Sequence, residues 1–162
     1  MAQQDDQGAA GASDLALTLT RVLEAPREAV FAAWTDPAQL TRWLGPGKIT
    51  AEVQKLDLRE GGAYRIVMHD VPAGGANVVT GIYRAIEPPS RLVFTWAWEE
   101  HAATHRAGHE SIVTITLRAL GNRTELTLRH ERFDTKKSRD SHDHGWNGCF
   151  DKLTQYLKPG RA

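Results

Sequence analysis

The sequence has little that would build a disulfide-linked or membrane-bound protein. Cys149 is its one cysteine, so no disulfide can form within the chain, and this favours a reducing compartment. No stretch approaches the run of about 20 apolar residues that a membrane span requires. The N-terminal residues 1–13 contain neither a basic segment nor an apolar one and do not resemble a signal peptide. We therefore expect a cytoplasmic protein with no membrane span.

Charge of one sign is also lacking. The chain has 20 Lys and Arg against 20 Asp and Glu, so the formal net charge is zero. Such a balance gives no general attraction to nucleic acid or to anionic lipid, and we expect no nucleic-acid partner. The sequence contains no nucleophile elbow, phosphate loop, dinucleotide fingerprint or paired-cysteine motif, and it predicts no cofactor.

The 162 residues suit one domain with a substantial core. Residues 1–13 are polar and rich in Gly and Ala, which is typical of a disordered tail. The remaining residues 14–160 show no internal repeat and no linker. We expect them to form a single domain.

Two short helices are predicted early in the chain, within residues 25–46. Each contains a tryptophan at helical spacing from other apolar residues, Trp34 in the first and Trp43 in the second. Pro37 and Pro46 end the two runs.

Around these helices the pattern predicts strands and one long C-terminal helix. Alternation of apolar and polar residues, with Gly and Pro turns between the runs, indicates about six to seven strands close together in sequence. The predicted strands cover residues 15–20, 49–58, 63–69, 77–86, 91–98, 111–119 and 124–133. From 136 to 157 the spacing of Trp146, Phe150 and Leu153 is helical. The order predicts an α+β fold, a curved antiparallel sheet wrapped around the last helix.

The inward faces of these elements are rich in aromatic rings. They can fill a solid core, which is the usual role of buried rings. Alternatively, they can line a ligand cavity within the usual range of about 300–1,000 Å³, because one sheet over one helix has difficulty filling its own interior. The residues expected to line such a cavity are Trp43, Tyr64, Met68, Tyr83, Phe94, Trp96, Trp98, His130, Trp146 and Phe150.

Two of these residues are candidates for catalysis. His130, on an inward strand face, has the chemistry of a general base, and Tyr83 that of a proton donor or hydrogen-bonding group. A histidine that simply satisfies its hydrogen bonds in the core is the commoner case. Cys149 has no cationic neighbour in sequence that would lower its pKa, so we expect it to pack in the core.

Histidines elsewhere offer weaker alternatives. His101, His105 and His109 recur at i, i+4 and i+8, a spacing that would let a helix bind zinc or nickel. A loop between two strands with scattered histidines explains the pattern better, because apolar periodicity is missing there. His142 and His144, together with Asp143, could serve acid–base chemistry near neutral pH. Their spacing of two residues puts them on different helix faces, which favours capping or exposure.

Five segments taken together resemble a known family. They are RVLEAPREAVFAAWTDPAQLTRWLGP (21–46), DLREGGAYRIVMHD (57–70), GIYRAIEPPSRLVFTWAW (81–98), TELTLRHERF (124–133) and HGWNGCFDKLTQYL (144–157). In this order they resemble the homologues of the activator of the 90-kDa heat-shock protein ATPase. That family lies within the START-like helix-grip superfamily, also called SRPBCC. The resemblance implies a helix-grip fold, and the superfamily includes lipid and hormone carriers, polyketide cyclases and aromatases.

Three functions follow as hypotheses. The first is binding of a small hydrophobic or aromatic molecule in the cavity. The second is a cyclase-, aromatase- or hydrolase-type enzyme that uses the same cavity, although no residue set names a reaction. The third is a protein-interaction module that contacts a chaperone, which the short N-terminal tail makes the weaker choice. An edge strand could also support a homodimer.

Overall fold

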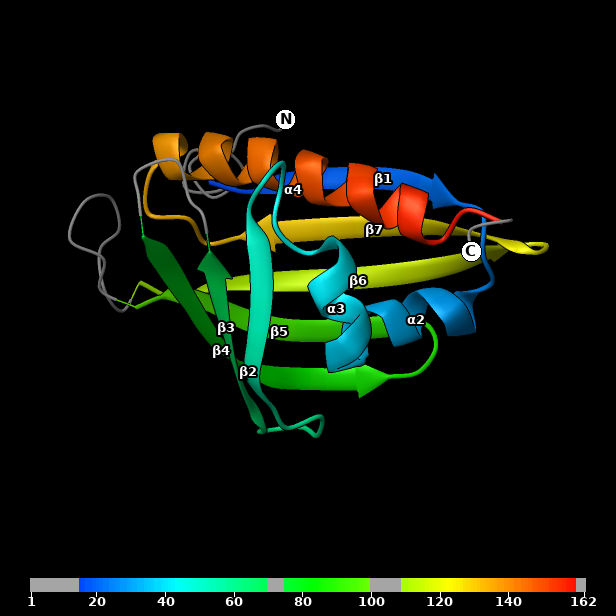
Figure 1. Ribbon diagram of the computed structural model, residues 1–162, viewed down its shortest axis with the longest axis horizontal. Coiled ribbons are helices and arrows are strands. Elements are labelled where there is room, and N and C mark those ends of the chain that lie inside the picture. Colours follow the sequence, from blue (N-terminus) through cyan, green and yellow to red (C-terminus); the bar gives the residue numbers. More distant parts are fainter. Residues whose placement is uncertain (1–14, 70–74, 100–108, 160–162) are drawn as a thin grey trace, which may run out of the picture.

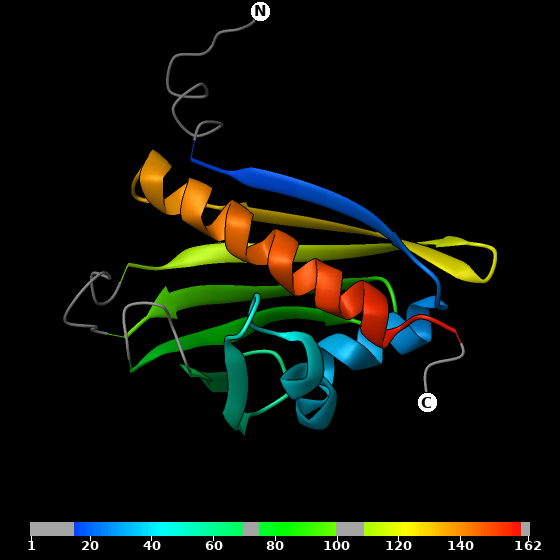
Figure 2. The same ribbon diagram turned by 45° about the horizontal axis from the view of Figure 1, so that its top comes forward.

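A seven-stranded antiparallel sheet curves around one long helix (Figures 1 and 2). The computed structural model describes residues 15–69, 75–99 and 109–159. The strands are β1 (Leu17–Leu23), β2 (Thr50–Leu56), β3 (Ala63–His69), β4 (Ala76–Glu87), β5 (Arg91–Trp98), β6 (Ser111–Leu120) and β7 (Arg123–Glu131). The helices are α2 (Arg27–Thr35), α3 (Pro37–Trp43) and α4 (Lys136–Tyr156). The α+β helix-grip prediction is confirmed.

The sheet is a meander with one crossover. Strands β2 to β7 each pair with the next in sequence, and β1 pairs with β7, which gives the order β1-β7-β6-β5-β4-β3-β2. The alternation that predicted the strands holds in space. On β7, for example, Leu126, Leu128 and His130 are buried, whereas Arg129 between them is exposed. This face of the sheet lies beneath α4.

Helix α4 runs diagonally across the inner face of the sheet (Figure 2). Its buried residues Trp146, Cys149, Phe150 and Leu153 recur at spacings of three and four, so one stripe of the helix faces the core. Thr135 caps its N-terminus by accepting a hydrogen bond from the Ser138 amide. Among the helices of the described ranges, none is both long and apolar enough to cross a membrane.

Helices α2 and α3 form a tight pair beside the C-terminal half of α4. Asp36 separates them and caps α3 by accepting from the Ala38 amide, with Pro37 in the first helical position. The Trp43 indole donates to the Ala33 carbonyl oxygen (2.9 Å), and its ring packs edge-on against Trp34 at 4.6 Å between centroids. These contacts fix the angle between the two helices.

Some predictions fall on residues outside the described ranges. The tail 1–13 is one, and His101 and His105 are others.

Two glycines in α4 have different surroundings. A Cβ at Gly148 would lie 2.5 Å from the Pro46 side chain, so glycine is needed where the helix meets the loop after α3. A Cβ at Gly145 would meet no atom within 4 Å. Close packing therefore does not require glycine at position 145.

This contrast gives a stability prediction. Gly148→Ala should lower the free energy of unfolding by about 1–3 kcal/mol, because the rigid Pro46 ring must move. Gly145→Ala should raise it by up to about 1 kcal/mol, because alanine is the better helix former. Urea unfolding of both variants measures the two changes. Equal effects of the same sign would contradict the assignment of Gly148 to close packing.

Candidate functional site

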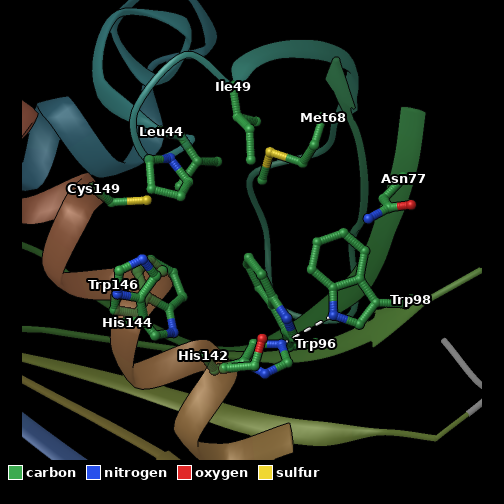
Figure 3. A pocket seen from close by; sticks show the side chains of 13 residues that line it. Leu44, Ile49, Met68, Asn77, Trp96, Trp98, His142, His144, Trp146 and Cys149 are labelled. Carbon is green, nitrogen blue, oxygen red and sulfur yellow. Dashed lines mark hydrogen bonds between the residues drawn. The ribbon is translucent and has the colours of Figure 1, made fainter. Parts of the chain in front are cut away.

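A pocket of about 270 Å³ lies between the N-terminal half of α4, the loop after α3 and the inner face of strands β3 to β5 (Figure 3). Most of its wall is apolar. The lining residues are Leu44, Pro46, Ile49, Met68, Asn77, Trp96, Trp98, Ser141, His142, His144, Gly145, Trp146 and Cys149.

Three tryptophans form the aromatic part of the wall. Figure 3 shows Trp96 between Trp98 of β5 and Trp146 of α4. The Trp96 ring centroid lies 5.1 Å from that of Trp146 and 5.7 Å from that of Trp98, with the second pair edge to face. Such rings present both faces and edges to a planar molecule.

His142 provides a polar link across the pocket. Its Nε2 accepts a hydrogen bond from the Trp98 indole (3.0 Å), and its Nδ1 donates to the Ser138 carbonyl oxygen (2.8 Å). These two bonds fix the neutral tautomer that carries its proton on Nδ1. They also join β5 to α4. The prediction that His142 caps the helix or faces solvent is wrong, whereas His144 is exposed at the pocket rim.

Cys149 is buried in the wall, as predicted. The Gly45 amide donates to its Sγ (3.2 Å). Burial raises the pKa of the thiol to about 12, against smaller opposing effects of the Gly45 amide and Lys152. The thiol is therefore protonated and a poor nucleophile at neutral pH.

Next to the pocket lies a smaller inner chamber of about 20 Å³. It shares the wall residues Leu44, Trp96 and Trp146 with the pocket. Its other lining residues are Trp34, Leu40, Tyr64, Ile66, Tyr83 and Phe94. Burial raises the pKa of the Tyr83 hydroxyl, so this group keeps its proton. The Tyr64 hydroxyl is already used, because it donates to the Thr95 carbonyl oxygen.

The structure separates the ten residues expected at a cavity into three groups. Met68, Trp96, Trp98 and Trp146 line the pocket. Tyr64, Tyr83 and Phe94 line the inner chamber, together with Trp96 and Trp146. Trp43, His130 and Phe150 line neither and are buried in the core.

Apart from Trp146, the pocket residues of α4 were not predicted to line a cavity. His142, Gly145 and Cys149 lie at i, i+3 and i+7, the face that also carries Trp146. The helical period of this face, extended in both directions from Trp146, would have found them.

His130 has partners on both ring nitrogens. Its Nδ1 accepts from the Trp146 indole (3.0 Å), and its Nε2 lies 2.7 Å from Ser111 Oγ, which in turn donates to the Trp96 carbonyl oxygen. Its Nε2 therefore carries the proton, donated to Ser111. Burial lowers the pKa of the imidazole well below its usual value, and nearby His142 lowers it further.

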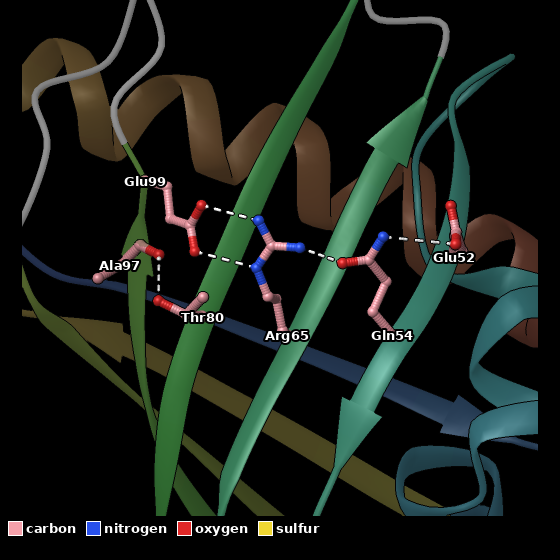
Figure 4. Close-up of polar contacts among 6 residues, drawn as sticks. All are labelled: Glu52, Gln54, Arg65, Thr80, Ala97 and Glu99. Carbon is pink, nitrogen blue, oxygen red and sulfur yellow. Dashed lines mark hydrogen bonds and ion pairs between the residues drawn. The ribbon is translucent and has the colours of Figure 1, made fainter.

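The opposite face of the sheet carries a polar row that is separate from the pocket. Figure 4 shows Arg65 between Glu99 and Gln54, with α4 behind the strands. Arg65 donates to both carboxylate oxygens of Glu99 (3.1 and 3.0 Å), and this hydrogen bonding lowers the pKa of Glu99. The two side chains are 39% and 42% exposed, so the pair contributes little to stability.

No group of three or more His, Cys, Asp or Glu within residues 15–69, 75–99 and 109–159 is arranged to hold a metal ion. His109, the described member of the predicted histidine row, instead donates through Nε2 to the Arg132 carbonyl oxygen (2.8 Å). The row as a whole stays a prediction, because His101 and His105 lie outside those ranges.

Comparison with known proteins gives one family and many similar structures. The family model for "Activator of Hsp90 ATPase homolog 1-like protein" matches residues 24–158. A search of curated proteins gives no significant match.

Three of the similar structures, all from bacteria, illustrate the match. A crystal structure of a Chromobacterium violaceum protein is 28% identical, with a TM-score of 0.79, and the match covers 89% of this chain and 98% of that one. The AHSA1 protein of Silicibacter pomeroyi is 29% identical with a TM-score of 0.76, covering 88% and 96%. A Rhodobacter sphaeroides protein is 26% identical with a TM-score of 0.74, covering 90% and 94%.

The buried His130 predicts a pH dependence of stability. Its pKa is lower in the folded state than in the unfolded state, so the unfolded state binds more protons below about pH 6.5. Above that pH the imidazole is neutral in both states and the full free energy of unfolding is present. As the pH falls, the free energy of unfolding decreases by up to about 1.4 kcal/mol per pH unit. His130→Gln should flatten the dependence between pH 6.5 and 4.5 in urea unfolding. The control His144→Gln, at an exposed site, should keep the wild-type slope, and an equal slope in all three proteins would contradict the assignment.

Proposed function

The chain belongs to the family of activator of Hsp90 ATPase homolog 1-like proteins, and we propose that it binds a small hydrophobic, aromatic molecule in the pocket beside α4. Its family membership agrees with the resemblance inferred from the sequence. We further propose that it acts in the cytoplasm, which its single buried cysteine supports.

The composition of the pocket wall is the main support for this proposal. Three tryptophans and two histidines surround about 270 Å³ of space, close to the lower end of the usual range for small-molecule sites, about 300–1,000 Å³. Burying an aromatic ligand among these rings would remove apolar surface from water and add edge and face contacts. The few polar groups could orient the ligand.

Gly145 supports the same proposal. Glycine weakens a helix interior by about 1 kcal/mol relative to alanine. Gly145 lines the pocket, and a Cβ there would enter open space. Its lack of a side chain therefore leaves room in the pocket at a cost in helix stability.

No specific observation supports either of the two alternative functions, catalysis and protein interaction. Against catalysis, both ring nitrogens of His130 are hydrogen-bonded, to Ser111 and Trp146. The residue also lines neither the pocket nor the inner chamber. For protein interaction, the large apolar side chains exposed in the described ranges are Val22, Leu58 and Ile82. They lie on three separate segments, β1, the turn after β2, and β4.

Filling the pocket tests the proposal. N-phenyl-1-naphthylamine is a neutral aromatic probe whose fluorescence rises in an apolar site. It should bind the wild-type protein saturably. Gly145→Phe should weaken its binding at least about tenfold, because the new ring occupies the space that the probe needs. A fluorescence titration measures both affinities.

Gly145→Ala is the matched control, since it changes the same residue but adds only one methyl group. It should bind the probe within about threefold of wild type. Unfolding curves for all three proteins check that each is folded. Absence of saturable binding to the wild type, or equal binding to Gly145→Phe, would refute a ligand site in this pocket.

A further inference from the structure

The hydrogen bonds of the five tryptophans divide them into two groups. Trp43 donates to the Ala33 carbonyl oxygen, Trp98 to His142 and Trp146 to His130. The indole nitrogens of Trp34 and Trp96 are buried and have no acceptor among the described residues. Trp34 is 4% exposed and Trp96 is 6% exposed. A buried donor without an acceptor is costly, so its presence in a native fold requires an explanation.

Both of these tryptophans line the inner chamber, and Trp96 also lines the pocket. The chamber has about 20 Å³ of space, enough for one small polar atom or one water but too little for a ring. The Tyr83 hydroxyl, another potential donor, lines it too. These three residues, each of which carries a donor group, thus line a chamber with room for a single acceptor.

The pocket wall has no permanently charged side chain. None of its lining residues is Lys, Arg, Asp or Glu. Each nitrogen of His142 already has a partner in the neutral tautomer, and the Cys149 thiol keeps its proton. A charged ligand would have to leave water without gaining a counter-charge from this wall, which is unfavourable.

We infer that the ligand is a neutral, planar aromatic molecule with a carbonyl-type oxygen, which accepts a hydrogen bond from the Trp96 indole at the entrance to the inner chamber. The inference rests on the proposed function and extends it to a ligand class. The rings of the ligand occupy the pocket, in contact with its aromatic wall, and the oxygen of the ligand reaches the chamber. Trp34 and Tyr83 are the further donors available to it there.

A pair of tricyclic probes measures how much the carbonyl oxygen contributes to affinity. 9-Fluorenone and fluorene share one framework and differ in the carbonyl group. Each is measured by displacement of N-phenyl-1-naphthylamine from the full chain. Because the two probes differ in their hydration, the informative quantity is the change in their affinity ratio between wild type and variant.

Trp96→Phe keeps an aromatic ring and removes the indole donor. It should lower the affinity for fluorenone about fivefold more than the affinity for fluorene. Trp98→Phe is the matched control, because the Trp98 donor is already bound to His142. It should change both affinities by a similar factor. The anion 9-fluorenone-2-carboxylate should bind wild type at least about tenfold more weakly than fluorenone.

A measurement on the wild type observes the Trp96 indole directly. In ¹⁵N-labelled protein each tryptophan gives one indole N–H signal, and the signal missing in Trp96→Phe identifies Trp96. Fluorenone should move that signal downfield, as a new hydrogen bond does. Fluorene should move it less.

The outcomes separate this inference from the function on which it rests. If N-phenyl-1-naphthylamine does not bind, both fail. If it binds but Trp96→Phe lowers the two tricyclic affinities equally, the acceptor at Trp96 is refuted while the aromatic site stands. A water held in the chamber predicts that second result. Equal binding of the carboxylate would refute a neutral ligand.

Discussion

The hydrogen bond from the Trp146 indole to His130 attaches α4 to the sheet, and the remaining architecture depends on it. Trp146 lies in the middle of α4, and His130 lies on β7 beside the edge strand β1. Both side chains are buried, so loss of either would leave a polar group without its partner away from water. The same indole packs against Trp96 at 5.1 Å between centroids. One side chain thus ties the helix to both β7 and β5.

This attachment divides α4 into two halves with different surroundings. Toward the C-terminus, Phe150 packs against Trp34 of α2, with ring centroids 6.3 Å apart, and the helix pair α2–α3 closes the core there. Toward the N-terminus, His142 and Gly145 face the pocket instead. The two short helices extend over only part of the inner face of the sheet (Figure 1). The pocket is therefore a consequence of topology, and aromatic side chains from both layers form its wall.

The fold could be predicted because local patterns determine its elements. Alternation marked the strands, the spacing of Trp146, Phe150 and Leu153 marked α4, and proline marked the ends of the helix pair. The site was only partly predictable for a physical reason. An inward-facing ring either lines a space or is covered by neighbours, and only tertiary packing decides which. Trp96 and Phe150 were both predicted to face inward, yet Phe150 is covered by α2 and Trp96 faces the pocket. Gly145 and Gly148 also look alike in the sequence as glycines within a predicted helix, and only the folded structure brings Gly148 against Pro46.

The hydrogen-bond inventory of the core links stability to binding. Three indoles use acceptors supplied by the protein, and those bonds hold α2 to α3, β5 to α4 and β7 to α4. The remaining two, Trp34 and Trp96, are buried beside one chamber, and neither has an acceptor within the described ranges. A buried donor in this condition costs stability. A ligand that supplies the acceptor offsets this cost only in the folded state, so its binding shifts the unfolding equilibrium toward the fold. A fully satisfied core would be more stable, but it would leave no donor to distinguish an oxygen-bearing ligand from a plain hydrocarbon. Under the proposed binding, the donors of Trp34 and Trp96 would therefore exchange some stability of the fold for selectivity in the pocket.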